Sequence, residues 1–140
     1  MTTSWLAVAA VAACAIGALS PTPATAHAST ERVTPALAQA IPNIPGKSLI
    51  AVVVEYPPGG ASPPHVHAKS AFIYGYVIAG AIESQVNDGR RQILRTGQSF
   101  YEPPGARHSV SRNASKTHPA KLLAVFVVDT DDTALTTSTE

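Results

Sequence analysis

The chain has almost no sulfur chemistry available to it. Its 140 residues include one cysteine, Cys14, and one tryptophan, Trp5, and both lie near the N-terminus. The rest of the chain therefore cannot use a disulfide, a thiolate ligand or a cysteine nucleophile, so a metal site in it needs histidine and oxygen ligands. The charge is nearly balanced, with ten basic and nine acidic residues and no basic tract. This balance argues against a nucleic-acid partner.

Charge is also missing from the N-terminal segment, since residues 1–28 contain no Lys, Arg, Asp or Glu. Residues 6–19 form one apolar run, shorter than the roughly 20 residues that a membrane-spanning helix needs. Prolines and two Ala-x-Ala sequences follow. We predict a signal peptide over residues 1–26, with cleavage after Ala26 or Ala28, and hence a secreted or periplasmic protein without a membrane span. A lipid anchor at Cys14 and a buried helix of the folded domain are the alternatives.

The remaining chain divides into three parts. Residues 27–46 are punctuated by proline and predict an N-terminal arm that is either a short helix or extended. Residues 47–128 are rich in β-branched and aromatic runs separated by Gly, Pro and Asn, which predicts an all-β sandwich or barrel. Residues 129–140, rich in Thr and Asp, predict a flexible C-terminal tail. Strands are expected over residues 49–56, 71–86 with a break at 79–80, 91–94, 99–101, 109–112 and 121–128, with a hairpin turn at Asn87-Asp88-Gly89.

Three of the five histidines form a pattern typical of a metal site. His65 and His67 are two positions apart in an extended, proline-preceded segment, so their side chains project from the same face of a strand. His108 follows a Pro-x-Gly turn some forty residues later. Three imidazoles are a ligand set that Zn, Cu, Fe or Ni accept. Surface histidines beside a proline loop are the alternative.

These residues carry a resemblance to a known family. From about Lys47 to Val128 the chain resembles a single cupin domain, a small jelly-roll barrel of the quercetinase-like type. The first cupin motif is matched at Gly59, His65, His67 and Gly80, and the second at Gly97, Pro103, Gly105 and His108, with Asn113 one position late. The resemblance implies that His65, His67 and His108 are metal ligands. It also implies a metal-binding Glu at Ile73, or at Ala71 or Phe72, and no carboxylate is there.

Two residues are candidates to complete the site. Glu102 directly precedes the Pro103-Pro104-Gly105 turn, and a carboxylate near an apolar barrel is costly unless it meets a cation or a hydrogen bond. We expect Glu102 to act as a fourth metal ligand or as a general base; a solvent-facing Glu, or one paired with Arg107 or Lys69, is the alternative. Tyr74 is the second candidate, because related cupin lyases keep a tyrosine near the metal. A core aromatic residue is its alternative role.

Together, the predicted signal peptide and the resemblance imply an exported cupin with one divalent ion, which is Fe, Ni, Cu, Mn or Zn. Such a protein acts as a dioxygenase, a lyase or an isomerase on a small oxygenated or aromatic molecule. The partners expected are therefore a small-molecule substrate and, as is common in cupins, a second copy of the chain in a homodimer. A non-catalytic binding or sensing cupin and a metal-free structural barrel are the alternatives.

Overall fold

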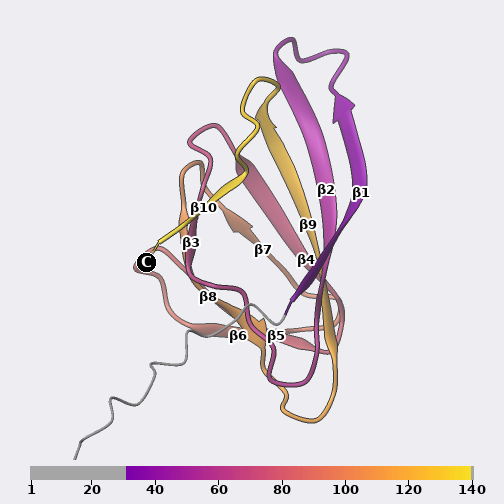
Figure 1. Ribbon diagram of the computed structural model, residues 1–140, viewed down its shortest axis with the longest axis vertical. Helices are drawn as coiled ribbons and strands as arrows, with labels where there is room; N and C mark the ends of the chain where they lie inside the picture. The colour runs from indigo at the N-terminus through magenta and orange to yellow at the C-terminus, as the bar shows by residue number, and fades with distance from the viewer. Residues whose placement is uncertain (1–30, 140) are drawn as a thin grey trace, which may run out of the picture.

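The computed structural model describes residues 31–139, so the predicted signal peptide, its cleavage sites and Cys14 lie outside the described residues. The described residues form ten strands in two five-stranded sheets that lie against each other (Figure 1). The strands are β1 (Arg32–Ala40), β2 (Lys47–Tyr56), β3 (His65–His67), β4 (Phe72–Ala79), β5 (Ala81–Val86), β6 (Gln92–Arg95), β7 (Ser99–Glu102), β8 (Arg107–Asn113), β9 (Ala120–Asp129) and β10 (Thr136–Ser138).

The two sheets have the interleaved order of a jelly roll. The first sheet runs β1-β2-β9-β4-β7 and the second runs β10-β3-β8-β5-β6, with antiparallel pairing throughout. Neighbours within each sheet are mostly distant in sequence, as for β2 beside β9. The prediction of an all-β jelly-roll barrel is confirmed. No helix among residues 31–139 is long and apolar enough to cross a membrane.

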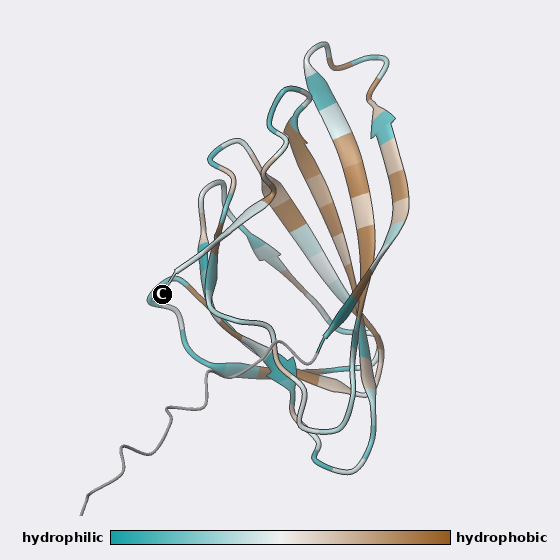
Figure 2. Cartoon of the chain, in the orientation of Figure 1, coloured by the Kyte–Doolittle hydropathy of each residue, from teal (hydrophilic) through white to brown (hydrophobic). Residues whose placement is uncertain are grey.

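Alternation of side chains places the core between the sheets. In β2 and β9, Val54 lies opposite Leu122 and Val52 lies opposite Ala124, and these side chains point toward the second sheet. The apolar residues of β2, β9 and β4 form the brown bands that run along the first sheet in Figure 2. Buried side chains group into two clusters, one around Tyr56 and Leu122 and one around Phe126.

The hairpin after β5 forms where the sequence predicts it. Asn87, and not the glycine of the Asp-Gly pair, takes the left-handed conformation. Asn87 has a φ of 51°, and Gly89 is not among the residues with positive φ. Asparagine tolerates this conformation, and its side-chain oxygen accepts a hydrogen bond from the backbone N–H of Arg107 at 2.9 Å. The turn is therefore fixed by a contact with β8 rather than by the freedom of glycine.

Both ends of the described chain contain strands. The arm predicted as a short helix or an extended segment contains β1, which pairs with β2 along its length. The tail predicted as flexible contains β10, which pairs with the histidine strand β3. Each of these strands lies at an edge, and β-branched threonines suit the pairing of β10. The two sheets thus extend beyond residues 47–128 on both sides.

Candidate metal centre

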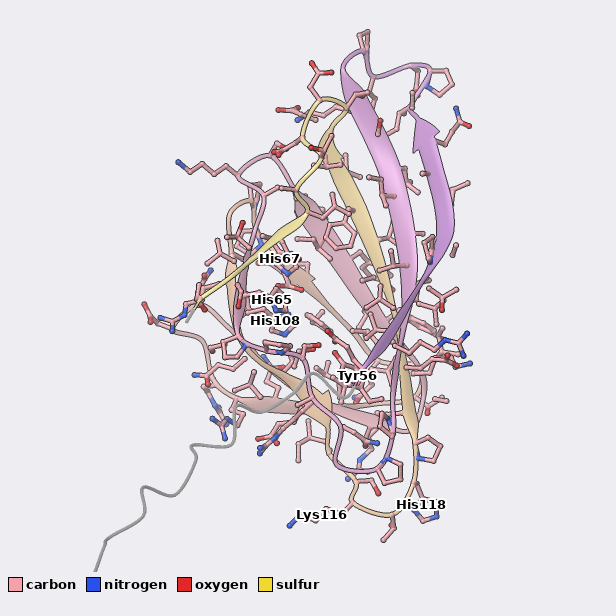
Figure 3. All side chains as sticks on the ribbon, in the orientation of Figure 1. Tyr56, His65, His67, His108, Lys116 and His118 are labelled. Atoms are coloured by element: carbon pink, nitrogen blue, oxygen red, sulfur yellow. The ribbon has the colours of Figure 1, made fainter. Side chains whose placement is uncertain are left out.

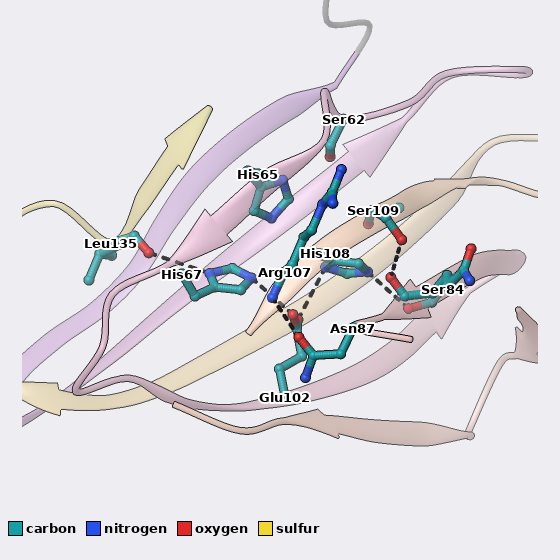
Figure 4. Close-up of polar contacts among 12 residues, drawn as sticks. Ser62, His65, His67, Ser84, Asn87, Glu102, Arg107, His108, Ser109 and Leu135 are labelled. Atoms are coloured by element: carbon teal, nitrogen blue, oxygen red, sulfur yellow. Dashed lines mark hydrogen bonds and ion pairs between the residues drawn. The ribbon is translucent and has the colours of Figure 1, made fainter. Parts of the chain in front are cut away.

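The three motif histidines meet on the inner face of the second sheet. His65 and His108 are direct cross-strand partners between β3 and β8, and His67 lies two positions beyond His65 on the same face. One ring atom from each of the three histidines lies within 4.8 Å of the others. His67 and His108 are buried, with 5% and 3% of their surfaces exposed. Figure 4 shows the three rings turned toward a common space.

One nitrogen of each histidine ring forms a hydrogen bond with a neighbouring residue, which holds the ring in place. His65 Nδ1 lies 2.8 Å from the carbonyl oxygen of Pro63, and His67 Nδ1 lies 3.4 Å from that of Leu135. His108 Nε2 lies 2.9 Å from Ser84 Oγ. A carbonyl partner fixes the hydrogen on Nδ1, so the opposite nitrogen keeps its lone pair for another ligand. Burial, the largest effect, also lowers the pKa of His65, which favours the neutral ring.

Glu102 lies beneath the histidines and is almost completely buried, with 3% of its surface exposed. Its Oε2 is 3.0 Å from His67 Nε2, and its Oε1 is 3.2 Å from His108 Nδ1. Burial on its own would raise the pKa of Glu102, but the contacts with His108 and His67 outweigh it and lower the pKa to about 2. The solvent-facing alternative, and pairing with Arg107 or Lys69, do not describe this carboxylate.

The register of the first sheet places this carboxylate beside the position of the missing one. Ile73, where the resemblance implies a metal-binding Glu, is the direct cross-strand partner of Glu102 between β4 and β7. Directly opposed residues of an antiparallel pair point to the same face. Ile73 is itself buried in an apolar cluster. The carboxylate of Glu102 therefore lies on the strand next to β4, directly opposite Ile73, and contacts the histidines.

The donor set fits a metal ion. His67 Nε2 and Glu102 Oε2 are buried 3.0 Å apart, yet within the described residues neither atom has a hydrogen-bond partner of suitable geometry. Buried polar atoms without hydrogen bonds are rare in proteins. Three imidazoles and one carboxylate are also a donor set common to transition metals.

Tyr74, in contrast, is not brought to the histidines. It lies on β4 next to Ile73, and successive residues of a strand point to opposite faces. Its side chain is 43% exposed on the outer face of the first sheet. Because Tyr74 is one position out of phase with the inner face, it is neither beside the metal centre nor in the core. His118 is also remote, in the exposed loop before β9 (Figure 3).

A pocket of about 340 Å³ opens beside the histidines, between the two sheets. His65 and His108 line it, together with apolar side chains of β2 and β9, and Phe126 also packs against His67 with ring centroids 5.6 Å apart. A small molecule in this pocket can therefore reach the position that the imidazoles surround. The pocket also has polar residues that the sequence pattern did not single out: Glu31, Tyr56, Ser62 and Ser111.

Sequence reasoning also missed the groups that orient the histidines. Ser84 and the Leu135 carbonyl come from β5 and from the segment before β10, and no motif marks either of them. Only Pro63 had a local signal, because it lies just before the His-x-His segment. The pairing of distant strands, not local sequence, brings these groups into place.

Comparisons with known proteins agree with the fold described above. The family model described as Cupin domain matches residues 52–126. Germin-like protein subfamily 2 member 2 of Arabidopsis thaliana is 30% identical over 98 residues, which is 67% of this chain and 43% of that protein. The chain thus spans less than half the length of this relative.

Two solved structures show the same fold. TT1209 from Thermus thermophilus superposes with a TM-score of 0.58 and 25% identity, over 71% of this chain and 84% of that chain. An oxalate oxidase superposes with a TM-score of 0.56 and 25% identity, over 77% of this chain and 53% of that chain. Both likenesses cover most of the barrel described above.

Proposed function

The chain belongs to the cupin family, and from that membership and the site we propose that it is an exported metalloprotein acting on a small oxygen-bearing molecule. The observation that carries the proposal is the buried carboxylate of Glu102, placed 3.0 Å from His67 and 3.2 Å from His108 in a cluster of three histidines. Burying such a group is costly unless a cation or hydrogen bonds compensate it. A resident metal ion accounts for its position.

His65, His67, His108 and Glu102 would hold the ion. The second nitrogen of each imidazole is already engaged, so the four residues present one atom each without rearrangement of the strands. Mn, Fe, Ni, Cu and Zn all accept imidazole and carboxylate ligands, and these donors leave the choice among them open. In this arrangement Glu102 acts as a ligand, which is the first of the two roles expected for it.

We propose dioxygenase-like chemistry on a small oxygenated or aromatic substrate. When bound, the ion would lower the pKa of a coordinated acid or hydroxyl and, if redox-active, bring the substrate together with O2. The chain's own part is to bind the substrate in the apolar pocket and to exclude water with residues such as Phe126. The likeness to a protein named oxalate oxidase supports a small oxygen-bearing substrate.

Export is part of the proposal, and its support is the uncharged, apolar segment that ends in Ala-x-Ala. Expression with this segment, followed by N-terminal sequencing of the protein found outside the cytoplasm, tests it. A mature chain that begins at His27 or Ser29 agrees with export and cleavage. An intact chain that stays in the cytoplasm contradicts them.

A homodimer is the second part of the proposal. The outer face of the first sheet carries exposed apolar side chains on adjacent strands, among them Phe72 and Tyr101, whose rings stack at 5.8 Å between centroids. Tyr74 belongs to the same face. An apolar face of this kind on a single chain is typical of an interaction surface. A second copy of the chain would cover it.

Replacement of Glu102 by Gln tests the metal-ligand assignment. Because Gln lacks the charge of a carboxylate, we expect Glu102→Gln to weaken metal binding by at least about tenfold, the scale on which groups around a metal affect its affinity. Titration calorimetry of the metal-free protein with Zn²⁺ and with Mn²⁺ measures this. Tyr74→Phe, on the outer face, is the matched control and keeps the affinity of the parent.

Two outcomes would contradict the proposal in different ways. If Glu102→Gln binds both ions as tightly as the parent, Glu102 is not a ligand, and its second expected role as a base is left for turnover assays. If the parent binds neither of these ions, nor Fe, Ni or Cu in the same experiment, the histidine cluster is not a metal centre and the proposed function fails.

A further inference from the structure

The pocket contains a second polar group that the metal proposal does not use. Tyr56 Oη lies 2.7 Å from Ser62 Oγ and 2.8 Å from Ser111 Oγ, and Ser62 Oγ donates a hydrogen bond to the carboxylate of Glu31. All four residues line the pocket that reaches the histidines. We call this group the hydroxyl chain. In Figure 3 Tyr56 lies apart from the three histidines along the barrel.

The hydroxyl chain and the metal centre are separated by a length suited to one small molecule. Ser111 follows His108 by three positions on β8, which is roughly 10 Å along an extended strand. Between them, the pocket wall is made of apolar side chains from β2 and β9, including Val54 and Leu122. A ligand that fills the pocket would therefore have polar contacts at both ends and apolar contacts along its middle.

All hydrogen bonds of the hydroxyl chain are donated in the same direction. A carboxylate only accepts, so Ser62 spends its hydrogen on Glu31 and must accept from Tyr56. Tyr56 thereby directs its own hydrogen toward this pair, so Ser111 must donate to Tyr56. Ser111 thus donates to Tyr56, Tyr56 donates toward Ser62 and Glu31, and Ser62 donates to Glu31. Each of these three hydroxyl hydrogens is donated within the hydroxyl chain, so the hydroxyl chain offers a ligand only oxygen lone pairs.

The buried tyrosine keeps this order fixed. Tyr56 is 2% exposed, and burial, with a further contribution from the charge of Glu31, raises its pKa to about 12. Its hydroxyl therefore stays protonated across the physiological range and always has one hydrogen to donate. A ligand group that only accepts hydrogen bonds, such as a second carboxylate, would have to break one of the three bonds to receive a hydrogen from the hydroxyl chain.

We propose that the hydroxyl chain is a specificity site that binds a hydrogen-bond donor, an ammonium or a hydroxyl group, at the end of the substrate remote from the metal centre. The substrate class is then a bifunctional molecule, with a metal-binding oxygen group at one end, an apolar middle of about four carbons and a donor at the other end. Glu31 is a positioning residue, since its carboxylate sets the direction of donation. This inference rests on the proposed function for the oxygen end of the ligand.

Three acids of equal length test the inference on the zinc-loaded protein: pentanoate, 5-hydroxypentanoate and 5-aminopentanoate. Titration calorimetry measures their binding, and the zinc content is determined on the same sample. We expect a donor-bearing acid to bind about tenfold more tightly than pentanoate, the factor that one additional hydrogen bond provides. The better of the two donor-bearing acids identifies the donor as a cation or as a hydroxyl.

Variants of Glu31 separate positioning from packing. Glu31→Gln brings an amide donor to Ser62 and allows the hydroxyl chain to reverse, so we expect the preference for a donor-bearing acid over pentanoate to disappear. Glu31→Asp restores the carboxylate and part of the preference. Glu55→Gln removes the same charge from the residue next to Tyr56, on the opposite face of β2, and is the matched control that keeps the preference.

The outcomes distinguish this inference from the proposed function. Equal binding of the three acids to a zinc-containing sample, or binding of none of them, overturns the inference and leaves the metal centre in place. A sample that takes up neither zinc nor any other candidate ion overturns the proposed function, and the inference is then decided on the metal-free protein by NMR. There, n-butylammonium shifts the amide resonances of Ser62 and Ser111 if the inference holds, and leaves them unchanged, as butanoate does, if it fails.

Discussion

At the scale of single residues, the two cupin motifs contain positions that serve the backbone as well as positions that serve the site. Gly80 and Gly97 have φ angles of 74° and 86°, in the left-handed region that side chains with a Cβ rarely adopt. Asn113 is buried, and its side-chain nitrogen donates to the carbonyl oxygens of Pro57 at 3.0 Å and His118 at 2.7 Å. These motif residues hold the loops that connect the strands, and the histidines between them form the candidate metal centre.

The surroundings of Gly80 and Gly97 predict different losses of folding stability when each is replaced by alanine. At Gly97 an added Cβ meets nothing within 4 Å, so Gly97→Ala should cost only the strain of the positive φ, about 1 kcal/mol. At Gly80 the Cβ would lie 2.6 Å from the carbonyl oxygen of Pro119, a backbone atom. We expect Gly80→Ala to cost roughly 2–4 kcal/mol in urea unfolding experiments. Equal losses for the two variants would refute the steric part of this explanation.

The motif residues were also the part of the site that sequence could predict. His65, His67 and His108 were predicted from their spacing, and Glu102 from the cost of a carboxylate near an apolar barrel; the structure brings these four side chains together. Tyr74 was expected at the site but lies on the other face, because proximity to a motif in sequence does not give the phase of a strand. The hydroxyl chain had no signal, since its members are far apart in sequence and meet only through the pairing and packing of the strands.

At the scale of strands, periodicity predicted the central elements well and the edges poorly. The expected strands over 49–56 and 121–128 correspond to β2 and β9, which are extended by two residues or fewer at each end. All nine residues of β1 are exposed, so its sequence shows no alternation of buried and exposed positions. It also has a register shift between Pro35 and Leu37. Its strand conformation comes from pairing with β2, which no local pattern reveals.

An ion pair between β5 and β8 gives a pH-dependent contribution to stability. Glu83 and Arg112 are direct cross-strand partners, with Oε2 and Nη2 2.6 Å apart. The hydrogen bond from Arg112 lowers the pKa of Glu83 below its ordinary value of 4.5. A lowered pKa in the folded state means that the stabilisation is present above pH 4.5 and is lost as the pH falls through the folded-state pKa.

Replacement of Glu83 by Gln tests this contribution. Arg112 and Arg91, which both form ion pairs with Glu83, are about half exposed, so solvent screens the interaction, and we expect a loss of about 0.5–1 kcal/mol at pH 7. At a pH below the folded-state pKa the parent carboxyl is protonated, and the difference between parent and variant should vanish. Urea unfolding at neutral pH and at a series of acidic pH values provides the comparison. The same difference at every pH would show that the loss comes from packing.

At the scale of the whole molecule, the first sheet has one face toward the candidate metal centre and an outer face on which we propose that a second copy binds. Five strands about 4.8 Å apart, each with about eight residues at about 3.3 Å, span roughly 600 Å² of sheet. This is close to the approximately 800 Å² that each partner buries in a stable interface. Tyr101 is 65% exposed on this face. The exposed aromatic side chains of this face therefore support the proposed homodimer, although the flat area of the sheet is smaller than a standard interface.

Charge placed on this face should separate the two copies without unfolding either. We expect the parent to sediment as a dimer and the Tyr74→Asp, Tyr101→Asp double variant to sediment as a monomer in analytical ultracentrifugation. Ile93→Asp is the matched control, because Ile93 is 58% exposed on β6 of the second sheet. The control should remain a dimer. A monomeric parent, or a double variant that stays dimeric, would contradict the assignment of this face.

The metal content of the mature protein tests the central claim most directly. The protein is expressed with its own N-terminal segment, recovered without chelators or affinity metals, and compared with a His65→Ala, His67→Ala double variant by elemental analysis. We predict about one equivalent of a transition metal per chain in the parent and none in the variant. If neither protein contains metal, even after incubation with each candidate ion, the buried cluster of His65, His67, His108 and Glu102 is not a metal centre.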